Sequence, residues 1–191
     1  MIAKTTIGEK IKKLRKDKEI SLKELSKNSG VKEDLIKDIE EGEIIPSLAP
    51  LIKISRSLGV RLGTLLDDTI EEGPVIVREG KAGKIIHFSG QEDETSESHL
   101  DFYSLAAGKV DRHMEPFIVQ VEAHKDKFKL SSHEGEEFIY VLEGEIEILY
   151  GKEKYHLKEG DSIYYDSIVP HHLHTKDNKP AKILAVVYTP F

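Results

Sequence analysis

The 191-residue sequence predicts a two-domain chain, in which an all-α domain is followed by an all-β domain. Up to about Leu66, apolar residues recur every three or four positions, which is the spacing of amphipathic helices. From Pro74 onward, apolar and polar residues alternate, which is the spacing of strands with one buried face. We therefore place a helical domain at residues 1–68, a linker at 69–74 and a β domain at 75–191.

The helical domain is expected to contain five short helices around one small core. Gly30, Gly42 and Gly59 are placed to end the second, third and fourth helices, and Pro46-Ser47 opens the fourth. The apolar positions that recur at helical spacing, and that we assign to the core, are Ile7, Ile11, Leu14, Leu22, Leu25, Leu35, Ile36, Ile39, Leu48, Leu51, Ile52, Leu58, Leu62, Leu65 and Leu66.

The second part of the chain has short alternating segments at regular spacing, which is typical of a β sandwich or barrel. A hairpin is predicted over residues 74–88, with Gly80 and Gly83 on either side of its turn. Two further strands are expected between residues 101 and 130. The remaining strand segments are residues 138–151, 154–165 and 181–190.

Composition excludes some classes of protein and locates the charge. The sequence has no cysteine, so disulfides and thiolate chemistry are excluded, and it shows neither a signal peptide nor a membrane span. We expect a cytoplasmic protein with no membrane partner. Residues 1–68 carry 14 Lys and Arg against 12 Asp and Glu, whereas the rest of the chain carries 14 against 23. Because the first domain is net basic and the rest of the chain is net acidic, we expect only the first domain to bind a polyanion.

The helical part resembles the lambda-repressor-like (XRE) helix-turn-helix family over residues 6–68. The resemblance implies binding to double-stranded DNA, with the third helix in the major groove and the second helix across the phosphate backbone. The residues that carry it are the spacing of Leu22 and Leu25, the turn Ser29-Gly30-Val31, the ending Ile39-Glu40-x-Gly42, and Pro46-Ser47-Leu48.

Carried over by position, the resemblance assigns Lys23 to a phosphate, and Lys32, Glu33 and Lys37 to bases or backbone. It pairs Glu40 with an arginine of the first helix, here Arg15, so Glu40 is a structural residue. The third helix is acidic for a DNA reader, because Lys37 is the one basic residue between positions 33 and 43. A helix-turn-helix that serves instead as a dimerisation or docking module is the alternative.

The β domain resembles the cupin fold, a double-stranded β-helix or jelly-roll barrel, over about residues 75–190. The first cupin motif is matched by His133, Glu137 and Gly144, and the second by Gly160-Asp161 and Pro170-His171. Two positions differ from the family pattern. Ser131 occupies the place of the first histidine, and Thr175 occupies the place of an asparagine.

The cupin resemblance leaves His133, Glu137 and His171 as candidate metal ligands. Two imidazoles and one carboxylate form the facial triad of non-haem Fe(II) sites, and these donors also suit Zn, Mn or Ni. A polar cluster satisfied by its own hydrogen bonds is the alternative. Strand parity places Ser131, Ile139 and Val141 on the same inward face, and Tyr103 is a further candidate for the pocket lining. The net positive charge of an occupied site would favour an anionic small molecule.

This order of domains resembles a group of bacterial and archaeal transcriptional regulators. The resemblance implies a homodimer on a palindromic operator, with a barrel that senses a small molecule or a metal and so changes DNA affinity. The same architecture resembles the helix-turn-helix and cupin phosphonate epoxidase family, iron enzymes with a His-x3-Glu and a later His. That family uses a lysine of the first domain, where this chain has Glu19. We expect a regulator rather than an enzyme, and the alternative is an Fe(II)-dependent oxidoreductase.

Overall fold

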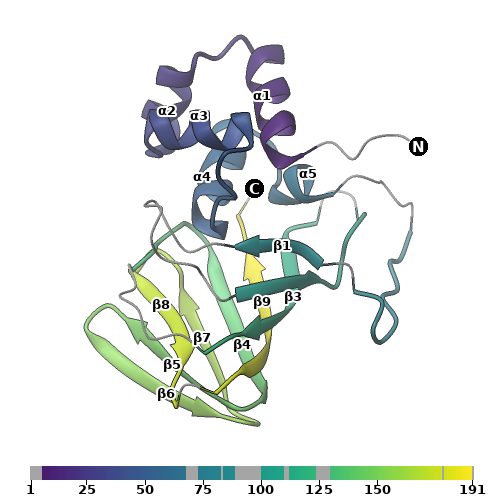
Figure 1. The fold of residues 1–191 in the computed structure, drawn as a ribbon, viewed down its shortest axis with the longest axis vertical. Coiled ribbons are helices and arrows are strands. Elements are labelled where there is room, and N and C mark those ends of the chain that lie inside the picture. The colour runs from purple at the N-terminus through teal and green to yellow at the C-terminus, as the bar shows by residue number, and fades with distance from the viewer. Residues whose placement is uncertain are drawn as a thin grey trace.

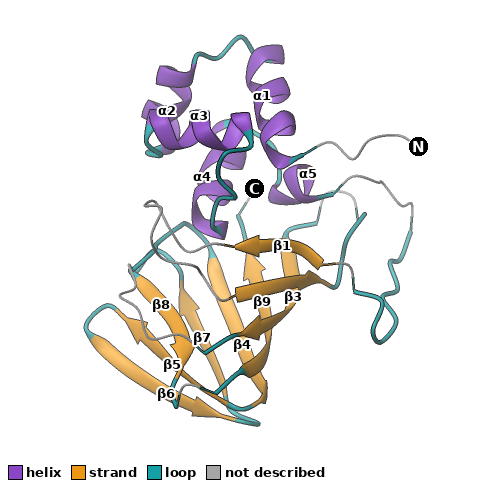
Figure 2. Cartoon of the chain, viewed as in Figure 1, coloured by secondary structure: helices purple, strands orange, loops and turns teal. Residues whose placement is uncertain are grey.

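The structure is a computed structural model that describes residues 6–67, 73–82, 84–88, 100–109, 112–123, 130–177 and 179–190. Helices gather at one end of the molecule, and the strands form a β sandwich below them (Figures 1 and 2). Both the all-α and the all-β prediction are therefore confirmed. Most of the predicted linker, residues 68–72, lies outside the described residues.

The described part of the first domain contains the five expected helices, and local sequence explains where they begin and end. Thr6 caps the first helix and Ser21 caps the second by accepting hydrogen bonds from backbone N–H groups three residues on. Gly30 and Gly42 end the second and third helices in the left-handed conformation. The helices are α1 (Ile7–Asp17), α2 (Leu22–Ser29), α3 (Glu33–Glu41), α4 (Leu48–Ser57) and α5 (Leu62–Leu66).

The apolar stripes of these helices meet in one core. Ile11, Leu25, Ile36, Leu51 and Leu65 are all fully buried, as the periodicity predicted. α1 packs against α3 and α5, while α4 packs against α2 and α5. α4 lies next to the sandwich, and α2 lies farther from it (Figure 1).

The strands form two antiparallel sheets. One has six strands in the order β1-β2-β3-β9-β4-β7, and the other has three in the order β6-β5-β8. Alternate residues of each strand point between the sheets, so the core contains Phe117, Ile139, Ile148 and Ile183. The strands are β1 (Lys84–Phe88), β2 (Leu100–Ser104), β3 (Met114–Val121), β4 (Glu136–Glu143), β5 (Glu145–Tyr150), β6 (Glu153–Lys158), β7 (Ser162–Asp166), β8 (His171–Thr175) and β9 (Ala181–Tyr188).

The hairpin predicted over residues 74–88 is wrong. Among the residues that the structure describes in this range, only Lys84–Phe88 forms a strand, and its partner is β2 rather than the segment before it. Residues 74–78 alternate in polarity but pair with no described strand, and Ile76 is 66% exposed. Alternation alone does not make a strand, because a strand also requires a neighbour that satisfies its backbone hydrogen bonds.

The two domains are joined by a buried arginine. Arg112, just before β3, donates from its Nη1 and Nη2 to the carboxylate of Asp67, and its Nε donates to Glu115 at 2.7 Å. The backbone N–H of Gly108 also donates to Asp67 at 2.9 Å. Side-chain exposure is 6% for Arg112, 11% for Asp67 and 1% for Glu115. A Cβ added at Gly63 would lie 2.8 Å from the guanidinium carbon, so α5 approaches the arginine closely. We call Asp67, Arg112 and Glu115 the interdomain clasp.

The clasp makes stability depend on pH. Burial raises the pKa of Glu115 from 4.5 to about 7 against the opposing attraction of Arg112. The folded carboxyl therefore holds its proton between about pH 4.5 and 7, where the unfolded chain releases it, so stability falls as pH rises through that window. We expect Glu115→Gln to remove this pH-dependent fall in the free energy of unfolding, which amounts to at most about 3 kcal/mol. Melting temperatures measured between pH 4 and 8 test this, and parallel profiles for the two proteins would contradict it.

Candidate functional site

Three side chains meet between the two sheets at the end near the helices. His133 lies in the loop before β4, Glu137 lies on β4, and His171 begins β8. Both histidine Nε2 atoms face the same carboxylate oxygen, Oε1 of Glu137, at 2.9 Å for His133 and 3.3 Å for His171. One ligand atom from each residue lies within 4.8 Å of the others. The residues that the sequence predicted as ligands are thus brought together.

Backbone carbonyls hold both rings in the orientation that a metal site needs. Nδ1 of His133 lies 3.1 Å from the carbonyl oxygen of Glu134, and Nδ1 of His171 lies 2.8 Å from that of Val169. A carbonyl only accepts, so Nδ1 carries a proton. Nε2 donates to Glu137 when the ring is charged, and it offers its lone pair to a metal when the ring is neutral. Metal-binding histidines are commonly held in this way by a backbone carbonyl. The donor set and its orientation therefore fit a divalent cation.

The electrostatics of the cluster also favour a cation. Burial alone would raise the pKa of Glu137, but hydrogen bonds from His133 and His171 outweigh it and hold that pKa well below its usual range. Burial lowers the pKa of His171, yet its contact with Glu137 gives a net increase. Glu137 is therefore an anion at neutral pH, and positive charge is stabilised beside it.

Two residues that hold Glu137 were missed from the sequence. The hydroxyl of Tyr165 donates to Oε2 of Glu137 at 2.7 Å, and the hydroxyl of Ser167 donates to Oε1 at 3.2 Å. Burial, followed by the charge of Glu137, raises the pKa of Tyr165 well above its usual value, so it stays a donor. Antiparallel pairing of β4 with β7 places Tyr165 directly opposite Glu137. Knowing how β4 and β7 pair would have identified Tyr165 as a neighbour of Glu137.

The predicted pocket residues fall in three different places. Ile139 and Val141 are buried on the inner face of β4, beyond Glu137. Ser131 is exposed, and its backbone exchanges both hydrogen bonds with His171 at 2.9 Å. The prediction for Tyr103 disagrees with the structure, since its hydroxyl donates to Gln120 on the outer face of the sheet. Phe102 is the buried neighbour that points inward, since adjacent residues of a strand face opposite sides of the sheet.

The loop that carries His133 also touches the helical domain. Its next residue, Glu134, forms an ion pair with Arg56 on α4. Gly135 follows with φ at +117°, and a Cβ there would lie 2.0 Å from the carbonyl oxygen of Tyr188. Only glycine fits that backbone and that close approach. The loop is therefore fixed between the cluster, the end of β9 and the helical domain.

The predicted DNA contacts lie on the exposed surface of the first domain. Lys23 is in the first turn of α2, Lys32 is the residue before α3, and Glu33 and Lys37 lie on α3. All four are exposed. Part of the acidity of α3 has a structural cause, since acidic residues in a first turn are favoured by the helix dipole.

Glu40 has the structural role that the sequence predicted. Nε and Nη2 of Arg15 donate to its two carboxylate oxygens, each at 2.7 Å, and Nη1 of Arg15 donates to the carbonyl oxygen of Ile20 at 3.0 Å. Glu40 is only 6% exposed. This acidic residue is therefore neutralised inside the domain and does not oppose DNA phosphates.

The fold and the sites define a helix-turn-helix protein with a β barrel that fits a metal. Comparisons with known families identify both parts: a helix-turn-helix model matches residues 11–65, and a cupin domain model matches residues 117–187. The chain thus has a helix-turn-helix domain followed by a cupin domain. No helix in the described ranges has the length and apolar character that a bilayer crossing requires.

Three relatives span nearly the whole chain. The HTH-type transcriptional regulator PuuR of Escherichia coli (strain K12) is 25% identical over 179 residues, covering 86% of this chain and 84% of its own. The structure of an HTH_3 family transcriptional regulator from Vibrio cholerae has a TM-score of 0.69 at 22% identity, covering 98% of this chain and 97% of the other, which shows a shared fold. The structure titled Fe(II)-HppE with alternative substrate (S)-1-HPP has a TM-score of 0.50 at 25% identity, covering 97% and 98%.

Proposed function

We propose that the chain is a DNA-binding transcriptional regulator whose cupin domain senses a divalent metal or a small molecule. The observation that carries the proposal is the combination of an exposed helix-turn-helix surface with a preformed His133, Glu137 and His171 cluster in one chain. The similarity to PuuR over both domains supports it. Fe, Zn, Mn and Ni all suit the donor set, and a bound divalent cation would retain positive charge that attracts an anionic effector.

The contacts between the domains provide a physical route for regulation. Ligand binding changes DNA affinity only if it favours one arrangement of the two domains over another. The loop residue Glu134 is adjacent to the ligand His133 and pairs with Arg56 of α4. The clasp of Asp67, Arg112 and Glu115 connects α5 to β3. A shift of His133 on binding a ligand would therefore act directly on the helical domain.

The proposed function is tested by selection of DNA from a random or genomic pool with the purified protein. The selection is run at low and moderate salt, with and without Fe(II) or Zn(II). We expect an enriched palindrome whose half-sites lie about one helical turn apart, with an occupancy that depends on the metal. Absence of enrichment under every condition would overturn the proposal.

Reversing two surface charges tests the docking surface. We expect Lys23→Glu with Lys37→Glu to weaken DNA binding by about tenfold or more, and to lower the salt dependence by about one unit of slope per lost phosphate contact. Fluorescence anisotropy on the selected operator at several salt concentrations measures both effects. The matched control is Lys152→Glu with Lys158→Glu, two exposed residues of the β domain. Equal losses in both double variants would show that the docking surface is misassigned.

A second candidate function is Fe(II)-dependent oxidation, favoured by the triad and by the similarity to the structure titled Fe(II)-HppE. His133, Glu137 and His171 would hold the iron, which supplies the redox chemistry, while Tyr165 and Ser167 orient the carboxylate. Oxygen uptake by iron-loaded protein with candidate phosphonates or other small anions distinguishes the two functions. Uptake that needs both iron and the added compound would establish an enzyme.

A further inference from the structure

The carboxylate of Glu137 divides its two oxygens between two kinds of partner. Oε1 faces Nε2 of His133 at 2.9 Å and Nε2 of His171 at 3.3 Å, so this oxygen lies where the three side chains would share a cation. Oε2 instead accepts a hydrogen bond from the hydroxyl of Tyr165 at 2.7 Å. Carboxylates bind metals through one oxygen or through both. Because Tyr165 occupies Oε2, Glu137 offers a cation one oxygen.

The ring of Tyr165 is packed against two other rings, which keeps this hydrogen bond in place. Its centroid lies 5.2 Å from that of the ligand His171 and 5.3 Å from that of Tyr150 on β5. Pairing of β4 with β7 sets the Cα of Tyr165 directly opposite that of Glu137, and Tyr165 is buried. In a close-packed interior, the hydroxyl cannot turn away from Oε2 without displacing one of the rings that surround it.

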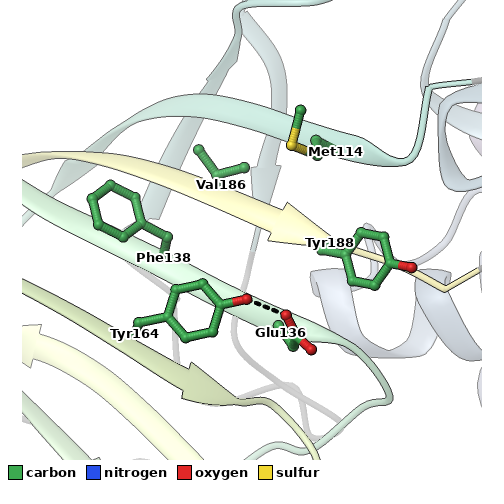
Figure 3. Close-up of a pocket in the computed structure, with 6 residues that line it drawn as sticks. All are labelled: Met114, Glu136, Phe138, Tyr164, Val186 and Tyr188. Atoms are coloured by element: carbon green, nitrogen blue, oxygen red, sulfur yellow. Dashed lines mark hydrogen bonds between the residues drawn. The ribbon is translucent and has the colours of Figure 1, made fainter.

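The same two strands carry a second tyrosine and glutamate pair on the opposite face of the sheet. The hydroxyl of Tyr164 on β7 donates to Oε2 of Glu136 on β4, and Figure 3 shows this hydrogen bond. Tyr164 is 63% exposed. Among the described residues, the cluster that could hold a metal includes Glu137 and not Glu136. The outer pair therefore has the hydrogen bond of the inner pair without the two histidines, and it serves as an internal comparison.

The number and kind of donor atoms decide which cations a site suits. Two imidazole nitrogens and one carboxylate oxygen give the cluster three donor atoms. Zn(II) in open sites is held by three protein donors, and Fe(II) is held by two histidines and one carboxylate with other positions open. Mn(II) and Ca(II) prefer more oxygen donors, and a carboxylate that binds through both oxygens supplies an additional one. A carboxylate limited to one oxygen therefore disfavours Mn(II) and Ca(II).

We propose that Tyr165 determines which metals the cluster accepts: by occupying Oε2 of Glu137, it selects Zn(II) or Fe(II) over Mn(II) and Ca(II). The inference rests on the metal site of the proposed function and narrows the metals that this site senses. Tyr165 is a positioning residue, because it acts on the cation through the carboxylate of Glu137. An ion held by three donor atoms also keeps positions open for an effector that binds through oxygen.

Comparison of two metals tests the inference without reference to DNA. Calorimetric titration gives the affinities of the wild-type protein and of Tyr165→Phe for Zn(II) and for Mn(II). We expect Tyr165→Phe to lower Zn(II) affinity by about 10- to 100-fold, as loss of a residue that holds a metal ligand does. Mn(II) affinity should fall less or rise, because the freed Oε2 adds an oxygen donor, so the ratio of Zn(II) affinity to Mn(II) affinity falls by about tenfold or more. An unchanged ratio would mean that Tyr165 only orients the carboxylate, which overturns the inference.

Three variants that each remove one hydroxyl nearby are the matched controls. Ser167→Ala removes the donor to Oε1 of the same carboxylate, so we expect both affinities to fall together and the ratio to stay at its wild-type value. Tyr164→Phe removes the hydrogen bond of the outer pair. Tyr150→Phe removes a hydroxyl that donates to a backbone carbonyl, and it keeps the ring that packs on Tyr165. We expect the wild-type ratio in both. A fall in the ratio as large as that of Tyr165→Phe in any control would overturn the inference.

A crystal structure of the Zn(II)-loaded wild-type protein tests the same inference without any variant, so a poorly folding Tyr165→Phe does not prevent a decision. We expect Zn(II) at about 2.0–2.2 Å from Oε1 of Glu137, the usual distance for a carboxylate ligand. Oε2 should lie outside bonding distance and keep its hydrogen bond from Tyr165. Zn(II) bound through both oxygens of Glu137 would overturn the inference. Circular dichroism and thermal melts establish which variants fold.

Failure of this inference can be separated from failure of the proposed function. A protein that selects a palindrome under metal control, and whose ratio of metal affinities is the same in Tyr165→Phe, would overturn the inference and leave the regulator standing. A ratio that falls as expected in a protein that selects no DNA would do the reverse. A wild-type protein that binds neither Zn(II) nor Fe(II) would overturn the inference.

Discussion

We expect His133→Ala and His171→Ala each to abolish stable metal binding, lowering metal affinity by more than about 100-fold. Removing a residue that only orients a metal ligand costs about 10- to 100-fold in affinity, so removing a ligand costs more. Each substitution takes one Nε2 donor from a set of three, and it leaves the Glu137 carboxylate with one imidazole partner fewer. Metal content measured by mass spectrometry after Fe(II) or Zn(II) loading, with calorimetric titration, gives the result.

The control for these variants lies on the same strand. Inward residues of β8 alternate with His172 and His174, which face away from the cluster. His174→Ala removes an imidazole from β8 and leaves all three proposed ligands in place. We expect it to bind metal as the wild-type protein does. Retained metal in His171→Ala, or loss in His174→Ala alone, would mean that the ligand set is wrong.

The cluster of His133, Glu137 and His171 was predictable because its sequence signal is local and is carried by two separate motifs. His133 and Glu137 are four residues apart in one motif, and His171 follows a proline in the other. Strand pairing brings the residues of the two motifs to one place. Tyr165 carried no comparable signal. Its role depends on the register between β4 and β7, and a shift of one residue would turn it to the other face.

The same dependence on register explains the position of Tyr103. Sequence alternation shows that neighbours point to opposite faces, but it does not show which of the two points inward. The structure gives the inward position to Phe102, whose ring packs edge-on against Phe117 with a centroid distance of 5.4 Å. The helical domain was easier to predict, since caps and glycines mark each helix in the sequence itself.

Nothing in the sequence distinguishes Arg112 from an exposed arginine, yet we expect its substitution to lower the stability of the protein strongly. Arg112→Ala leaves the carboxylates of Asp67 and Glu115 facing each other in a buried site without their shared cation. Removing one partner of a buried ion pair costs about 3–5 kcal/mol. We expect the helical domain to separate from the cupin domain, so that thermal unfolding shows two transitions where the wild-type protein shows one.

Matched variants separate charge from packing in this result. Arg56→Ala removes a more exposed arginine between the domains, whose side chain is 48% exposed, so we expect the free energy of unfolding to fall by at most about 1 kcal/mol. Combining Arg112→Met with Asp67→Asn and Glu115→Gln removes the charges together and keeps most of the volume. Because neutral groups replace all three charges, this triple variant should regain most of the stability that Arg112→Ala loses.

If the triple variant were no more stable than Arg112→Ala, the clasp would act by packing alone. Regained stability without restored metal control of DNA binding would show that the charged clasp also couples the cluster to the helices.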